Sequence, residues 1–219
     1  MKKFALVFLA FIFGSFLFFN APQAQAYTIG FYKITNNSTS DVSGQLSVDI
    51  LSTADDNVSF TFRNNVGLAS SITEIYFDDG TGVGTLFSGI VSLTNSSGVN
   101  FELDSITTPV NPENLPGGNL LSPPFVTTEG FSADATGSTA NGINAAGEFV
   151  TIIFGLNDGK EFNDVAAAIS SLDLRIGLHV RAHPDGNSDG YVNVPIPAAA
   201  WLLGSGLLGL VAIRRRVKK

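Results

Sequence analysis

Apolar and polar residues alternate with a period of two through much of the middle of the chain. In SGQLSVDIL (residues 43–51), Leu46, Val48 and Ile50 share one face and polar residues take the other. The same alternation occurs in residues 57–64 (NVSFTFRN), 98–106 (GVNFELDSI) and 172–182 (LDLRIGLHVRA). One apolar face per strand is typical of antiparallel sheets that pack a single face on the core. The pattern therefore predicts antiparallel strands in these four segments.

Three further segments are more continuously apolar: residues 72–77 (ITEIYF), 85–94 (TLFSGIVSLT) and 147–156 (GEFVTIIFGL). Such runs indicate strands buried on both faces, so we expect them at the centre of the sheets. In residues 160–173 (KEFNDVAAAISSLD) the apolar spacing is helical and predicts a short helix that caps one end. Together these elements predict an all-β fold, an antiparallel β-sandwich of jelly-roll type with one short helix.

The first 26 residues differ from this pattern. Lys2 and Lys3 precede an uncharged apolar stretch at 4–19, and Ala24 and Ala26 then supply a small-x-small site. This order is typical of a signal helix that is cleaved before Tyr27, which places the mature chain outside the cytoplasm. The alternative is an uncleaved anchor, because sixteen apolar residues are near the lower limit for a membrane span.

The C-terminal segment is also strongly apolar. Residues 196–213 are uncharged and as a helix span about 27 Å, close to the thickness of a bilayer's hydrocarbon core. Five basic residues follow and predict a cytoplasmic tail by the positive-inside rule: Arg214, Arg215, Arg216, Lys218 and Lys219. The alternative is a buried C-terminal helix of the domain. We thus divide the chain into a signal peptide (1–26), a β domain (27–186), a linker (187–195), a transmembrane helix (196–213) and a basic tail (214–219).

The charge between the two ends excludes one class of partner. The part of the chain between the two terminal segments holds all 19 acidic residues, from Asp41 to Asp189, and five basic ones, a net charge of −14 (the bases are Lys33, Arg63, Lys160, Arg175 and Arg181). Such a surface repels phosphate backbones, which argues against nucleic-acid binding. The chain has no cysteine, so disulfides, thiol nucleophiles and Cys-bound metals are also excluded.

The C-terminal sequence VPIPAAAWLLGSGLLGLVAIRRRVKK resembles the sorting signal of PEP-CTERM proteins, in the variant that opens V-P-x-P-A. The motif residues are Val194, Pro195, Ile196, Pro197 and Ala198; Ile196 replaces the Glu of the commonest form. The resemblance implies cleavage by the membrane peptidase exosortase, a Gram-negative source, and release to the cell surface or its extracellular polysaccharide. The body also resembles a recurring group of these proteins, for instance in residues 115–134 and 162–182, without implying an activity.

Candidate chemistry in the body is sparse. Asp185, Asn187 and Asp189, followed by Gly190, match the first half of a D-x-N-x-D-G calcium loop, although Ile196 stands where the loop's Glu belongs. Plain loop chemistry is the alternative for this segment. The two histidines, His179 and His183, lack a clear third metal ligand. H-E-x-x-H does not occur in the sequence, and the one G-x-S-x-G match, GNSDG at residues 186–190, lies in this turn-rich segment rather than between an apolar strand and a helix. We therefore expect a protein that is not an enzyme.

Two functional classes follow. The first is an exported, non-catalytic surface or matrix protein without a cofactor, processed by signal peptidase and exosortase and held transiently by its C-terminal helix. The second is a carbohydrate-binding module, with calcium as an aid. Sugar-binding faces usually stack rings on exposed Trp or Tyr. The single Trp, Trp201, lies in the apolar C-terminal segment, so the first class is favoured.

Overall fold

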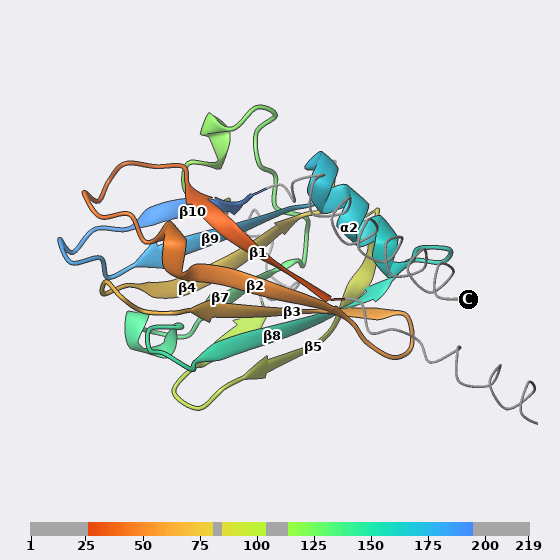
Figure 1. Cartoon of the computed structure of the whole chain (residues 1–219), viewed down its shortest axis with the longest axis horizontal. Helices are drawn as coiled ribbons and strands as arrows, with labels where there is room; N and C mark the ends of the chain where they lie inside the picture. Colours follow the sequence, from red (N-terminus) through yellow and green to blue (C-terminus); the bar gives the residue numbers. More distant parts are fainter. Residues whose placement is uncertain (1–25, 81–84, 104–113, 195–219) are drawn as a thin grey trace, which may run out of the picture.

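The structure, a computed structural model, describes residues 26–80, 85–103 and 114–194 (Figure 1). This part of the chain forms one antiparallel sheet with the strand order β5-β8-β3-β2-β1-β10-β9-β4-β7-β6. The strands are β1 Ala26–Lys33, β2 Leu46–Ser52, β3 Asn57–Asn64, β4 Ser71–Asp78, β5 Phe87–Asn95, β6 Phe101–Leu103, β7 Ser132–Ala135, β8 Phe149–Leu156, β9 Arg175–Arg181 and β10 Asp189–Asn193. The described residues hold one α-helix, α2 (Phe162–Ser171), and the 3₁₀ turns η1 Ser43–Gln45, η2 Gly118–Leu120 and η3 Thr139–Asn141.

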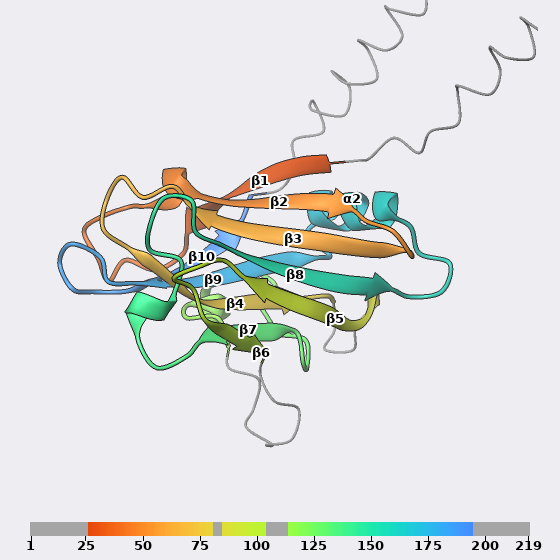
Figure 2. The same cartoon turned by 90° about the horizontal axis from the view of Figure 1, so that it is seen from below.

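Strand β1 joins two halves of this sheet. Its residues 26–30 pair with β2, and its residues 31–33 pair with β10. The halves β5-β8-β3-β2 and β10-β9-β4-β7-β6 face each other across a shared core (Figure 2). Phe60 and Phe154 of the first half meet Phe77 of the second in edge-on contacts with ring centroids 5.2 and 4.7 Å apart. Such aromatic pairs add to the stability that the apolar burial provides.

An asparagine side chain nearly closes the sheet. Strands β5 and β6 stand at the two ends of the strand order. The side-chain amide of Asn95, the last residue of β5, donates to the carbonyl oxygen of Phe101 and accepts from its N–H, each at 3.0 Å. Asn95 thus takes the place of a backbone partner for the first residue of β6.

The structure confirms the seven predicted strands and the predicted helix. Their central placement is right for β4 and β8, but it is wrong for β5, which is an edge strand. Two register shifts in β5 interrupt the alternation of inward and outward side chains, so apolar residues follow one another even though the strand lies at the edge. Val91 is consequently 60% exposed. Bulges of this kind are common on edge strands, where they discourage pairing with other chains.

Three strands were not predicted: β1, β7 and β10. The interpretation of residues 187–195 as a linker is wrong for β10, whose five residues are all buried and paired on both sides. The two expected flanking helices lie almost wholly in residues 1–25 and 195–219, outside the described residues. Within the part that is described, no helix has the length and apolar character needed to cross a membrane.

Candidate functional site: the end of the sheet where both chain ends emerge

The first and last described residues lie at the same end of the molecule. Strand β10 runs antiparallel to β1, so β10 ends on the side where β1 begins (Figure 1). Ala26 is opposite Leu51 at the start of β1. The N–H of Val194 donates to the carbonyl oxygen of Gly30 at 3.0 Å. The predicted signal-peptide site and the predicted sorting motif therefore both adjoin this end.

Helix α2 covers this end of the sheet, as its apolar spacing predicts. The side chains of Glu161 and Asp164 form a capping box that satisfies backbone N–H groups of its first turn. The Phe162 ring packs on Tyr27, with centroids 5.2 Å apart. Burial raises the pKa of the Tyr27 hydroxyl well above its ordinary value. The helix ends at Leu172, whose φ of 65° is left-handed.

An ion pair fixes the loop of residues 123–126 beside α2. The Arg175 guanidinium donates to the carboxylate of Asp78 and, at 2.7 Å each, to the carbonyl oxygens of Pro123 and Pro124. Asp78 also accepts the N–H of Val126 at 3.0 Å. The sequence did not suggest this pair, because Asp78 and Arg175 are almost a hundred residues apart and only the β4–β9 pairing brings them together.

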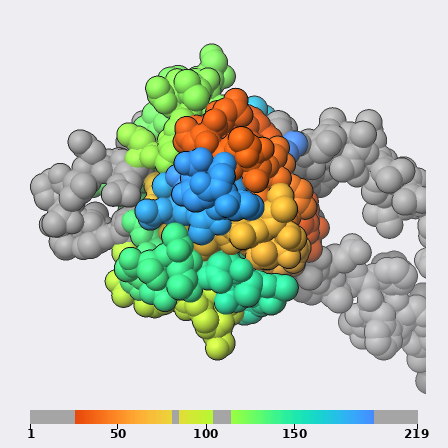
Figure 3. Space-filling model, turned by 90° about the vertical axis from the view of Figure 1, so that its left-hand side faces the viewer, coloured from red at the N-terminus to blue at the C-terminus, as the bar shows by residue number. Residues whose placement is uncertain are grey.

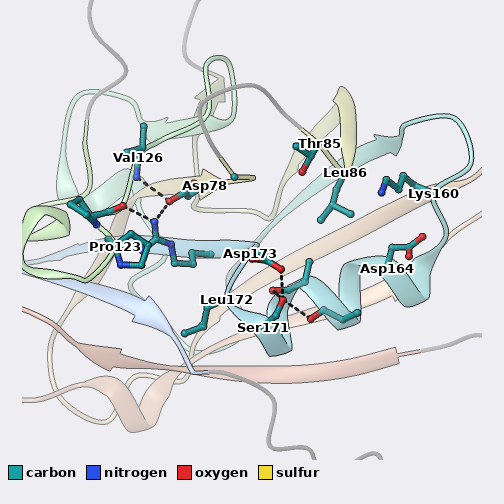
Figure 4. A pocket seen from close by; sticks show the side chains of 15 residues that line it. Asp78, Thr85, Leu86, Pro123, Val126, Lys160, Asp164, Ser171, Leu172 and Asp173 are labelled. Carbon is teal, nitrogen blue, oxygen red and sulfur yellow. Dashed lines mark hydrogen bonds and ion pairs between the residues drawn. The ribbon is translucent and has the colours of Figure 1, made fainter.

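A groove of about 770 Å³ separates this loop from α2 (Figure 4). Leu86, Val126, Ala167 and Leu172 give it an apolar lining, and its charged residues are Asp78, Lys160, Asp164, Asp173 and Arg175. Val126 and Leu172 are 47% and 43% exposed. The groove therefore offers apolar contact surface that solvent reaches, at the end of the sheet where both chain ends emerge.

The predicted calcium ligands lie at the opposite end, in the β9–β10 hairpin, which packs against the β1–β2 loop (Figure 3). Asp189 is fully buried and its carboxylate pairs with the Lys33 ammonium at 3.0 Å. It also accepts from the Thr35 hydroxyl at 2.6 Å and from two backbone N–H groups, those of Asn37 and Ser38. Burial alone raises the pKa of Asp189, but these hydrogen bonds outweigh it and hold the pKa below its ordinary value.

The other two predicted ligands do not complete a metal site with Asp189. The Asp185 carboxylate accepts the backbone N–H groups of Thr39 and Asn187 at 2.9 and 3.1 Å, bonds that lower its pKa. Among the residues that the structure describes, no three His, Cys, Asp or Glu side chains are placed to share a metal ion. The D-x-N-x-D-G sequence serves the hairpin here, with amide and ammonium donors where a calcium ion would need free oxygens.

The two histidines have separate environments. His179 Nδ1 lies 2.7 Å from a carboxylate oxygen of Glu74 on β4, which also accepts the Tyr76 hydroxyl. Burial alone raises the pKa of Glu74, but its bonds to His179 and Tyr76 bring it below the ordinary value. His183 is buried, with neither ring nitrogen hydrogen-bonded, and burial lowers its pKa. The two rings therefore do not form a metal pair.

An aromatic platform for sugars is not evident in the described residues. Tyr32 is the one aromatic side chain among those described that is exposed, at 43%.

Of the sorting motif, only Val194 lies in the described part; Pro195, Ile196, Pro197, Ala198, the basic cluster and Ala24 lie outside it. The chain matches no protein-family model, no curated protein and no solved structure.

Proposed function

We propose that this chain is an exported, non-catalytic cell-surface or matrix protein. In this proposal its body is a β-sandwich of jelly-roll type, and its two facing half-sheets are the two layers. Signal peptidase removes residues 1–26, and the C-terminal helix holds the body outside the membrane. An exosortase-type peptidase then cleaves within residues 194–198 and releases the body into the extracellular polysaccharide.

The proposal rests on the positions of Ala26 and Val194, the first and last residues that the structure describes. Ala26 and Val194 adjoin the same end of one sheet, so a membrane at that end meets both predicted hydrophobic segments without the chain crossing the body. Cleavage after Ala26 removes one strand residue, and cleavage beyond Val194 leaves β10 whole. Both processing steps are thus compatible with an intact fold.

The surface charge at this end also supports a body that sits outside a membrane with this end toward the lipid. The β2–β3 turn and the loop before α2 both lie there, and their exposed carboxylates belong to Asp55, Asp56, Asp158 and Glu161. Negative charge repels an anionic membrane surface within about a Debye length, roughly 8–10 Å in physiological salt. The acidic end would hold the body off the lipid and leave the cleavage motif accessible.

The masses of the two termini test this proposal. Protein recovered outside cells that produce exosortase should begin at Tyr27 and end between Val194 and Ala198. A Pro195→Ala/Pro197→Ala variant should keep Lys219 as its last residue and stay with the membrane, whereas the control Pro184→Ala, in an exposed loop, should be processed normally. Extracellular protein that ends at Lys219, or wild-type protein that remains in the cytoplasm with Met1 intact, would refute the proposal.

A further inference from the structure

The groove beside α2 lies where the described chain stops. The side-chain amide oxygen of Asn193 accepts the N–H of Ile176 at 2.7 Å, and the preceding residue, Arg175, lines the groove. Val192 pairs with Gly177 and packs with Leu115 and Phe125 on the outer face of the sheet. Because side chains alternate along a strand, Val194 shares that outer face with Arg175. The chain beyond Val194 therefore starts at one wall of the groove.

We propose that residues 195–197 (PIP) dock in this groove while the C-terminal segment remains attached, so that the membrane helix begins at Ala198 in the docked state. The segment is uncharged and apolar, like much of the groove lining. Its two prolines favour an extended polyproline conformation of about 3.1 Å per residue, so three residues cover roughly 9 Å. The role of this docking as control of a sorting signal rests on the proposed function.

The hydrogen bonding of the groove suits a proline-containing segment. The carbonyl oxygens of Pro123 and Pro124 already accept from Arg175, and the N–H of Val126 already donates to Asp78. The loop wall therefore offers mainly nonpolar contact. Prolines bring no backbone N–H that would need a partner there, and their rings add apolar area. Both sides of the contact are thus low in unsatisfied polar groups.

Leu172 gives an independent reason to expect an occupant. It terminates α2 in the left-handed conformation, where glycine is usual and where an L-residue costs about 1–2 kcal/mol. Its side chain belongs to neither buried hydrophobic cluster and is 43% exposed in the groove. An unfavourable backbone conformation that places a leucine in solvent points to a binding role. A docked segment would cover this side chain.

Disulfide trapping in the full chain tests the docking, since the protein has no native cysteine. Ala167 lines the groove and is exposed. Thr28 is also exposed and lies two residues from Gly30, the partner of Val194, but on the first half-sheet. In detergent micelles, Ala167→Cys/Ile196→Cys should form an intramolecular disulfide at least about tenfold faster than Thr28→Cys/Ile196→Cys, because docking raises the effective concentration. Equal rates, or disulfide-linked dimers in place of the intramolecular product, would overturn the inference.

A third substitution separates docking from mere proximity. Adding Leu172→Gly to the Ala167→Cys/Ile196→Cys chain removes the exposed leucine without straining the backbone, because glycine readily adopts the left-handed conformation. We expect trapping to slow several-fold while thermal unfolding shows the fold retained. An unchanged trapping rate in the folded variant would count against docking. Failure of trapping alongside normal cleavage near Val194 would refute only the docking, whereas trapping without cleavage would refute only the sorting.

Discussion

At the residue scale, the ion pair between Asp189 and Lys33 illustrates how one short motif allows two interpretations. The sequence offered Asp189 as a calcium ligand, and the structure buries it against the ammonium group of Lys33, 156 residues away in the chain. Asp189→Asn should lower the free energy of unfolding by about 3–5 kcal/mol, because it leaves Lys33 buried without its counter-charge. Urea denaturation of the two proteins measures this difference.

Asp185→Asn in the same hairpin is the matched control for that substitution. Its carboxylate is exposed, so solvent can replace the lost interactions and the free energy of unfolding should change far less. Millimolar calcium should not raise the melting temperature of the wild type. A calcium-dependent rise that Asp189→Asn abolishes would show that the motif binds the ion after all.

His183 predicts a pH dependence of stability. Burial holds its pKa below the ordinary value of 6.5, so the folded state favours the neutral ring. Its neighbours are Asp189, Lys33 and Asp185, and its ring stacks on Tyr191. The stabilisation by His183 is complete above pH 6.5 and declines as the pH falls below that value, because the unfolded chain then takes up the proton more readily.

We therefore expect the wild type to lose more stability between pH 7.5 and pH 5.5 than His183→Phe, which keeps an aromatic ring against Tyr191. Urea denaturation at the two pH values measures the difference. Ser188→Ala, on the same hairpin, should retain the wild-type dependence. An equal loss in His183→Phe and in the wild type would rule out His183 as its source.

At the scale of elements, the strands with a period-two pattern could be predicted and the others could not. Strand β10 (DGYVN) consists largely of turn-forming residues, and it is a buried strand only because β1 and β9 flank it. Strand β1 was also missed, because its first residue, Ala26, belongs to the predicted signal-peptidase site. Both failures concern pairings between distant parts of the chain, which local periodicity does not record.

Substitution of Asn95 tests how much the contact between the edge strands β5 and β6 contributes to stability. Asn95→Ala removes both hydrogen bonds to Phe101 and should lower the free energy of unfolding by about 1–3 kcal/mol. Asn95→Asp keeps the acceptor for the Phe101 N–H but loses the donor, so its effect should be intermediate. Faster hydrogen exchange of the Phe101 amide in Asn95→Ala would locate the change, and Ser97→Ala, an exposed neighbour, is the control.

At the scale of the whole molecule, the candidate site was predictable only in part. The two processing segments stay predictions from the sequence, where hydrophobic length and flanking charge are local properties, because both lie almost wholly outside the described residues. The sequence did not reveal that these segments adjoin the same end of one sheet, because this depends on the pairing of β1 with β10. It did not reveal the groove beside α2 either, because the ion pair at its wall depends on the pairing of β4 with β9. The first described strand thus pairs with the last, so residues 189–193 supply the backbone pairing that links the two half-sheets.

Truncation tests this dependence directly. A chain of residues 27–194 should unfold in one cooperative transition, because it contains all ten strands. A chain of residues 27–188 lacks β10, which leaves β1 and β9 without their shared neighbour and removes the buried ring of Tyr191. It should lose that transition in thermal melts followed by circular dichroism. A peptide of residues 189–194 should restore it, since strand addition supplies the missing ladder, whereas a Tyr191→Asp peptide should not. Cooperative unfolding of the 27–188 chain alone would mean that the halves hold together without β10, and that the position of Val194 is a detail of one strand rather than a requirement of the fold.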